Sequence, residues 1–194
     1  IEWFSRYNID GAGKHSHLRI IGRYQSSLSS MLNQTLHYKQ WADRRTLDAV
    51  ATIDASRNPD SLAFARQQLN HMVRVEELFK ARLLGDVEPH DSTNSKQVPA
   101  LEELDRRLSA SNAWLLEYAI TLTPEQLAQV IRFRFADGKL GSLSRQEILF
   151  HLVNHGTYHR GAIGHALDLA GAQRPPDTYT IYIHAAEPHR RERG

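Results

Sequence analysis

Residues 144–171 have the sequence SRQEILFHLVNHGTYHRGAIGHALDLAG and carry a pronounced helical pattern. Ser144 and Glu147 are spaced as in a capping box, in which each side chain accepts a hydrogen bond from the backbone N–H of the other residue at the start of a helix. Apolar residues then recur at helical spacing, at Ile148, Leu152, Ile163 and Leu167. Because Gly commonly follows the last residue of a helix, we expect this helix to stop at Gly171.

Three further helical patterns precede this segment. They span about 30–53, about 60–84 and a stretch that opens near Pro99 and is limited by Pro124. Between the third and fourth patterns, two short alternating runs flank the pair Asp137–Gly138, which is a strong β-hairpin signal. Four long helices with short connections predict an all-α four-helix bundle, with a small β-hairpin between the third and fourth long helices.

Length and composition fit one globular domain. The chain has 194 residues, of which 41% are hydrophobic, and this is enough for a self-sufficient core. We expect the bundle to occupy residues 31–185, with an N-terminal extension of unassigned role at 1–30 and a flexible tail at 186–194. Residues 1–30 lack the pattern of a signal peptide.

Composition and charge exclude several classes of protein. No stretch approaches the roughly 18 uninterrupted apolar residues of a membrane span, so we expect a soluble, cytoplasmic protein with no membrane partner. The chain has no Cys, which excludes disulfides, thiolate zinc sites and a cysteine nucleophile. The net charge is +2, but residues 31–183 hold 17 Lys and Arg against 18 Asp and Glu. Because a nucleic-acid binder normally carries a basic face on its folded body, we expect no nucleic-acid partner.

The chain contains 11 histidines, and four of them fall on predicted inward faces. His151, His155 and His159 follow one another at intervals of four residues, so they share one stripe of the fourth helix with its apolar residues. His71 lies on the apolar stripe of the second helix. A buried imidazole is costly unless its nitrogens find partners, and histidines on two inward faces can share one divalent cation.

This pattern predicts a metal site with three protein ligands, His71, His155 and His159, and an open position for water or substrate. His151 lies one turn further along the helix, and it is either a fourth ligand or a residue at the rim or behind the ligands. Imidazole suits zinc, nickel, copper and iron alike, so the spacing does not identify the ion.

Two observations limit this interpretation. A single inward histidine is more often a hydrogen-bonded core residue than a ligand, and these histidines could instead bond to carboxylates such as Glu76 or Glu77. The HExxH motif of zinc proteases does not apply either, because Gly156 occupies the position of its Glu.

Four other residues have open roles. His37, near Trp41 on the first helix, lines a pocket or lies on the surface. Tyr158 and Arg160 flank the histidine pair and could bind polar groups of a substrate, or lie on the helix surface. His90 falls in a linker and is expected to be solvated.

The stretch HLVNHGTYHRG, residues 151–161, closely resembles the signature of the DinB-like (damage-inducible) family of DinB/YfiT-like metalloenzymes. Weaker similarities follow one another along about residues 31–185. They are YKQWADRR at 38–45, LNHM at 69–72, FKARLLG at 79–85, FADG at 135–138 and PP at 175–176. The motif in the fourth helix is specific, and the others support it by their order.

The resemblance implies a four-helix bundle whose metal ligands fall on His71, His155 and His159, the same residues that the spacing selects. It further implies nickel or zinc as the ion and a homodimer as the common state of the protein. Most members have no assigned reaction, and some relatives are S-transferases that use mycothiol or bacillithiol. The resemblance therefore implies a site but no particular small-molecule substrate.

Two functions are compatible with this site. The first is a metal-dependent enzyme, of the hydrolase type or of the thiol S-transferase type, in which the ion activates water or an external low-molecular-weight thiol. The alternative is a non-catalytic metal-binding stress-response protein with a closed, fully ligated site. A cavity much larger than one water molecule would favour the enzyme.

Overall fold

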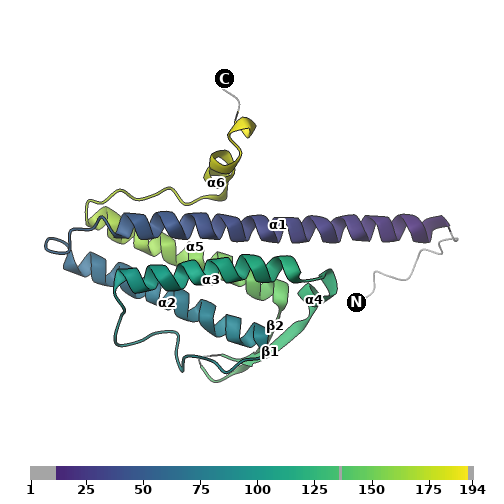
Figure 1. The fold of residues 1–194 in the computed structure, drawn as a ribbon, viewed down its shortest axis with the longest axis horizontal. Coiled ribbons are helices and arrows are strands. Elements are labelled where there is room, and N and C mark those ends of the chain that lie inside the picture. Colours follow the sequence, from purple (N-terminus) through teal and green to yellow (C-terminus); the bar gives the residue numbers. More distant parts are fainter. Residues whose placement is uncertain (1–11, 136, 192–194) are drawn as a thin grey trace.

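The protein is described here by a computed structural model, in which residues 12–135 and 137–191 are placed. Four long helices form a bundle (Figure 1). They are α1 (Ala12–Val50), α2 (Pro59–Leu84), α3 (Leu101–Thr121) and α5 (Arg145–Leu169). The shorter elements are α4 (Pro124–Ala128), β1 (Val130–Arg134), β2 (Leu140–Ser144), α6 (Tyr179–Ala186) and the 3-10 turn η1 (Pro188–Arg190). The predicted helical bundle with a hairpin between its third and fourth long helices is confirmed.

The ends of the helices mostly follow the sequence signals. Ser144 accepts a hydrogen bond from the N–H of Glu147, and the Glu147 carboxylate accepts one from the N–H of Ser144 at 2.7 Å, so the predicted capping box is present. Gly85 ends α2 with φ of 75°, a left-handed conformation that Gly adopts without strain. The first helix differs from the prediction, because it begins at Ala12 and crosses the boundary expected near residue 30.

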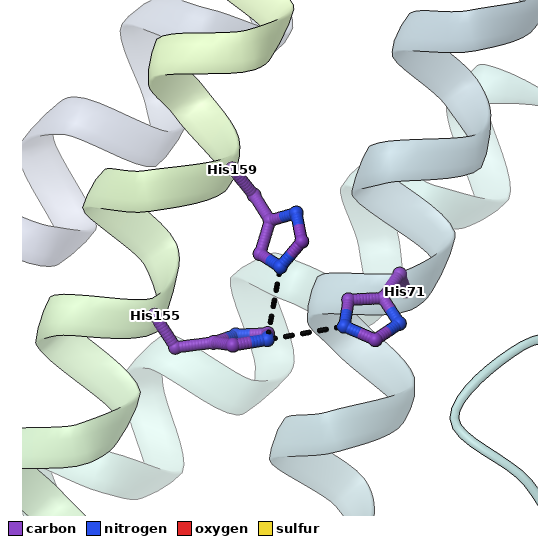
Figure 2. A group of neighbouring side chains, drawn as sticks. All are labelled: His71, His155 and His159. Atoms are coloured by element: carbon purple, nitrogen blue, oxygen red, sulfur yellow. Dashed lines mark hydrogen bonds between the residues drawn. The ribbon is translucent and has the colours of Figure 1, made fainter.

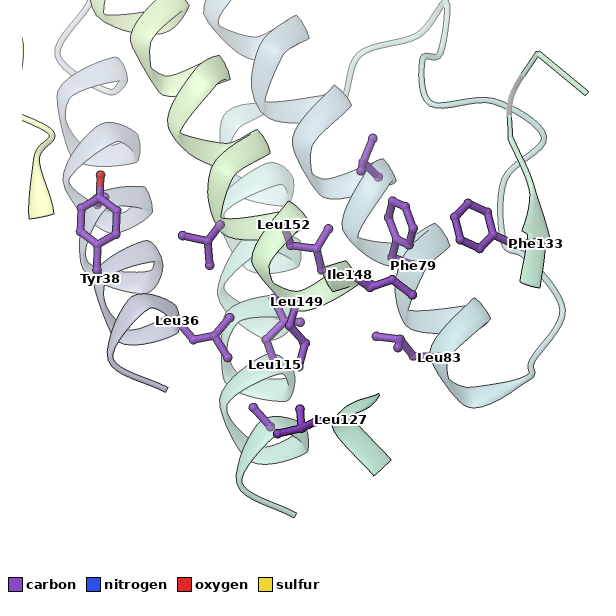
Figure 3. Close-up of a cluster of buried hydrophobic side chains, with 14 residues drawn as sticks. Leu36, Tyr38, Phe79, Leu83, Leu115, Leu127, Phe133, Ile148, Leu149 and Leu152 are labelled. Atoms are coloured by element: carbon purple, nitrogen blue, oxygen red, sulfur yellow. The ribbon is translucent and has the colours of Figure 1, made fainter. Parts of the chain in front are cut away.

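Buried apolar side chains form two clusters at different levels of the bundle. One cluster surrounds Ile148 and Leu152 of α5 and Phe79 of α2, close to the hairpin (Figure 3). The other surrounds Leu69 of α2 and Ile163 of α5. Each fully buried side chain of this size contributes about 1.5–3 kcal/mol, so the clusters fix α2 and α5 against each other. On α5, His155 and His159 lie between the two clusters, and on α2, His71 lies next to Met72 of the second cluster.

The hairpin is held against α2 rather than projecting into solvent. Its strands pair antiparallel, with Val130 opposite Ser144. Phe133 of β1 is buried, and its ring meets that of Phe79 edge-on with the centroids 5.4 Å apart. The hairpin therefore forms a wall beside the outer face of α2.

Two short helices were not predicted from the sequence. Helix α4 begins with a capping box of Thr123 and Gln126, and α6 packs against α1. The contact with α1 is aromatic, because the rings of Tyr179 and Tyr182 lie 5.7 and 5.9 Å from that of Tyr38. Within the placed parts of the chain, no helix combines the length and apolar character needed to cross a membrane.

Candidate metal centre

Three histidines from two helices converge at one point between α2 and α5. Figure 2 shows His155 and His159, one turn apart on α5, facing His71 on α2. Nε2 of His155 lies 3.1 Å from Nε2 of His71 and 3.0 Å from Nε2 of His159. One nitrogen from each ring lies within 4.8 Å of the others, as metal ligation requires.

The second nitrogen of two of these rings determines which tautomer each ring adopts. Nδ1 of His71 lies 3.2 Å from the backbone oxygen of Thr93, and Nδ1 of His159 lies 2.6 Å from Oε1 of Gln68. Because these oxygens only accept hydrogen bonds, both Nδ1 atoms carry the proton and both Nε2 atoms present a lone pair.

The donor set fits a cation. Nε2 of His155 faces the lone pairs of His71 and His159, and it can donate a proton to only one of them. At least one of the two short contacts therefore has no hydrogen bond, and its two nitrogens repel each other in the neutral state. A divalent ion bound by all three atoms would convert this repulsion into ligation.

The environment also keeps these rings in the neutral form that ligates metals. Burial, followed by the neighbouring His159 and His71, lowers the pKa of His155 to about 3. Burial, followed by His71, lowers the pKa of His159 to about 4. Both rings are thus neutral at physiological pH, with lone pairs free of protons.

The alternative hypothesis, in which the histidines bond to the carboxylates of Glu76 or Glu77, is not observed for the clustered histidines. Glu76 is paired with Lys39 at 2.7 Å and accepts a hydrogen bond from Ser111. Glu77 instead binds Arg107 and His90. The partners of the clustered imidazoles are neutral oxygens, so the charge of a bound divalent ion would not be compensated by them.

A cavity of about 640 Å³ opens beside the cluster. His71 and His155 lie in its wall, which also includes Phe79 of α2 and Phe135 and Gly138 of the hairpin segment. A water molecule in the liquid occupies about 30 Å³, so the cavity can hold an organic ligand next to the histidines. The structure therefore shows an open site rather than a closed one.

Two of the other predicted residues lie near the cluster. His151 lines the same cavity, and its ring centroid lies 5.4 Å from that of His155. Burial lowers the pKa of His151, so this ring is also neutral. Tyr158 is 75% exposed and presents its ring edge-on to His159, which places it at the outer rim of the site.

His37 and Arg160 lie away from the cavity, whereas His90 lines it. His37 is exposed and lines a separate depression with Trp41. Arg160 is only 3% exposed and lies in the bundle interior, so it is neither a surface residue nor part of the histidine cavity. The expectation that His90 is solvated is wrong, because its ring is 18% exposed, lines the histidine cavity and contacts Glu77 at 2.5 Å.

Arg160 belongs to a network of buried charges behind the histidines. Its guanidinium binds Asp43 at 2.8 Å and Asp177 at 2.8 Å, and Asp43 also binds Lys39 at 2.7 Å. Burial by itself would raise the pKa of Asp43, but the cations of Lys39 and Arg160 outweigh it and hold that pKa below its ordinary value. Burial raises the pKa of Glu76, which also pairs with Lys39. The network replaces the apolar core at the level of the histidine cluster.

The residues that orient the imidazoles were not predicted from the sequence. Gln68 lies three residues before His71, so the two share a face of α2, and that spacing could have identified it. Thr93 contributes a backbone oxygen from an irregular linker, and no sequence signal marks such a contact.

Comparison with known proteins agrees with the motif. Residues 27–192 match the DinB family, which is most of the chain. The chain belongs to the DinB family. One curated DinB relative, protein DinB of Bacillus subtilis (strain 168), is 30% identical over 112 residues, which is 55% of this chain. The chain spans 62% of the length of that relative. No solved structure gives a significant match.

The DinB match covers the whole candidate site. It includes α2 and α5 and therefore all three converging histidines, as well as the linker and hairpin that wall the cavity. The match begins at residue 27, inside α1, which itself starts at Ala12.

Proposed function

We propose that this DinB-family protein is a metal-dependent enzyme that holds nickel or zinc on His71, His155 and His159. Its reaction is either hydrolysis or the transfer of an external low-molecular-weight thiol to an electrophilic small molecule. The observation that carries this proposal is the convergence of three Nε2 atoms beside a cavity of about 640 Å³, which His71 and His155 line. A purely structural metal site has no need of such a cavity.

When bound, a divalent ion lowers the pKa of a coordinated water or thiol and so supplies a nucleophile near neutral pH. The chain contributes the positions of the three imidazoles, and Thr93 and Gln68 orient two of them, those of His71 and His159. The oxygens of Thr93 and Gln68 carry no charge, so they leave the charge of the ion available to an anionic ligand.

His151 is the residue placed to take the proton. It lines the cavity beside His155, and burial keeps its imidazole neutral and able to accept. In the thiol reaction, the thiol proton passes to His151 and the sulfur attacks the electrophilic carbon. A C–S bond then forms, while the leaving group departs with its electron pair.

The thiol must come from outside the protein, because the chain has no Cys. The cytoplasmic location, the homodimer and the absence of nucleic-acid and membrane partners stay predictions. The alternative function is that of a non-catalytic metal-binding stress-response protein, and the following experiment distinguishes it from the enzyme.

The experiment uses untagged protein loaded with zinc or nickel and two reactions. One is the addition of mercaptoethanol to chlorodinitrobenzene, which forms a C–S bond and releases chloride. The other is hydrolysis of nitrophenyl acetate. We expect one of the two rates to exceed background by at least about 100-fold, which is typical of proton transfer by a positioned group. The His155→Ala variant should lose this activity, and His165→Ala, an exposed position on the same helix, should keep it.

Two results would contradict the enzyme. One is equal rates in the wild type and the His155→Ala variant. The other is a loaded protein that accelerates neither reaction and binds no thiol, which would favour the non-catalytic alternative.

A further inference from the structure

The cavity beside the histidines extends along α2 well beyond the metal site. His71 stands at one end of its α2 wall and Arg82 at the other. These residues are 11 positions apart, which corresponds to about 16 Å along a helix. A ligand that reaches both ends is therefore elongated, with its reacting group at the histidines.

The α2 wall between the two ends is apolar, whereas His90, Asp91, Ser92 and Thr93 of the linker make another part of the lining polar. Val75, Leu78 and Phe79 of α2 line the apolar part, and Leu143 of β2 faces them. Apolar surface of this kind favours a hydrocarbon segment over a hydrated one, by about 0.8 kcal/mol for each CH₂ that leaves water.

The two arginines at the far end are in different electrostatic states. Arg82 forms a double hydrogen bond with Glu88, at 2.8 and 2.9 Å, and its guanidinium stacks over Phe79 and Phe133. The charge of Arg82 is thus compensated, and its position is fixed.

Arg134 has no such compensation. Its side chain donates a hydrogen bond to the backbone oxygen of Gly138, and none of the ion pairs among the described side chains of residues 31–135 and 137–191 includes it. Arg134 is an exposed residue of the cavity lining and lies next to Arg82, so an unpaired positive charge remains at the end opposite the histidines. The carboxylates of the wall are Glu88, which Arg82 binds, and Asp91 on the exposed linker.

We propose that the cavity binds an elongated small-molecule carboxylate, whose far end carries the group that reaches the histidines and whose carboxylate pairs with Arg134. This inference rests on the proposed function, because it assumes a metal at the histidine cluster. It adds the class of the ligand, an ω-functional carboxylic acid with an apolar spacer, and it makes Arg134 the residue that selects for the acid.

The test uses full-length protein loaded with cobalt, whose thiolate complexes absorb light and so report binding without any turnover. The probes are chain-terminal mercapto acids of increasing length, from mercaptoacetate through mercaptohexanoate to mercaptoundecanoate, each compared with the mercapto alcohol of the same length. Above a threshold length, the acid should bind about 10-fold more tightly than its alcohol, the size expected for a charge-assisted pair. At the shortest length, acid and alcohol should bind alike, because the carboxylate does not reach Arg134.

Variants assign this preference to one residue. Arg134→Gln should abolish the preference for the long acid, and Arg132→Gln, on the same strand but outside the cavity wall, should leave it unchanged. Arg134→Lys keeps the positive charge and should retain part of the preference for the long acid. If the Gln variant does not fold, this variant still tests the role of the charge at position 134.

The outcomes separate the two proposals. Binding of every thiol with no difference between acid and alcohol at any length would overturn this inference and leave the metal site standing. Loss of the preference in Arg132→Gln, or its persistence in Arg134→Gln, would overturn the assignment to Arg134. A cobalt-loaded protein that binds no thiol would overturn both the inference and the thiol branch of the proposed function.

Discussion

Gly156 lies so close to Arg160 that an added Cβ would stand 2.8 Å from Nη1 of the arginine and 3.8 Å from Cε of Lys39. Arg160 cannot easily move away, because the same nitrogen binds Asp43 at 2.8 Å. Gly156 directly follows His155, so one turn of α5 presents a histidine to the cluster and its bare backbone to the buried charges. Because residue 156 has no side chain, His155 and the close contact with Arg160 can lie on the same turn of α5.

The variant Gly156→Ala tests this close approach. We expect it to lower the free energy of unfolding by about 1–3 kcal/mol, the usual cost of inserting a methyl group into a packed interior. The matched control is Gly161→Ala on the same helix, where an added Cβ meets nothing within 4 Å. That variant should gain about 0.5–1 kcal/mol from the higher helix propensity of Ala. Urea unfolding measures both, and equal stability of the two variants would show that Gly156 is not closely packed.

The hydrogen bond from His159 to Gln68 predicts an indirect effect on metal affinity. Gln68→Leu removes the acceptor that orients the ring, and it should weaken metal binding by about 10–100-fold. Gln67→Leu, at the adjacent position, whose side-chain amide donates a hydrogen bond to Asn94, should leave the affinity unchanged. Competition with a chelator measures the metal dissociation constants of both variants. If the two variants bind metal equally well, Gln68 does not orient the ligand.

The lowered pKa values predict unusual resistance of the site to acid. An ordinary imidazole titrates near 6.5. The pKa of His155 is about 3 and that of His159 about 4, so protons begin to compete for these lone pairs only well below the ordinary value. We expect a bound ion to remain after dialysis at about pH 5 and to be lost between about pH 5 and 3. Loss of half the ion above about pH 6, in protein that is still helical by circular dichroism, would contradict these pKa shifts.

The same two pKa values determine how the free energy of unfolding of the metal-free protein changes with pH. The unfolded histidines take up protons as the pH falls through about 6.5, whereas His155 and His159 in the folded protein do not. The metal-free protein should therefore lose stability progressively as the pH falls below about 6.5.

The buried network predicts a large effect from loss of a single charge. Lys39 is 0% exposed and binds both Asp43 and Glu76 at 2.7 Å. Lys39→Met leaves these carboxylates without their shared cation and should cost about 3–5 kcal/mol of stability. Adding Glu76→Gln to this variant should recover part of the loss.

The control for this prediction is Arg44→Met. Arg44 also pairs with two carboxylates, Asp48 and Asp105, but at a side chain that is 46% exposed. Exposed pairs contribute about 0–1 kcal/mol, so the effect should be small. Thermal unfolding measures the loss of stability in Lys39→Met and in Arg44→Met. Similar losses in the two variants would contradict the stabilising role given to the buried Lys39 network.

Local signals predicted the bundle and the histidine cluster. The capping box at Ser144 and the apolar stripes determine where helices begin and which faces turn inward. The four-residue interval between His155 and His159 places both rings on one face in any α-helix, whatever surrounds it. These features depend on neighbours along the chain, which a sequence displays directly.

The features that escaped prediction depend on residues far apart in the chain. Lys39 and Asp43 have the same spacing as many exposed ion pairs, and only the packing of α3 and α5 over them makes the pair buried. Arg160 flanks a ligand in sequence, yet it points to Asp177, 17 residues later, rather than to the cavity. The start of α1 at Ala12 was also missed, although Leu18, Ile21 and Leu28 extend the helical spacing back from Leu32.

Metal analysis of the untagged protein tests the central claim most directly. After loading and extensive dialysis, the wild type should retain about one transition-metal ion per chain, with nitrogen ligands at about 2.0–2.1 Å by X-ray absorption. His71→Ala, His155→Ala and His159→Ala should each lose the ion, and His165→Ala, at an exposed position of α5, should retain it. Equal metal content in all four variants, or less than about half an equivalent in the wild type, would contradict a site built from these three imidazoles.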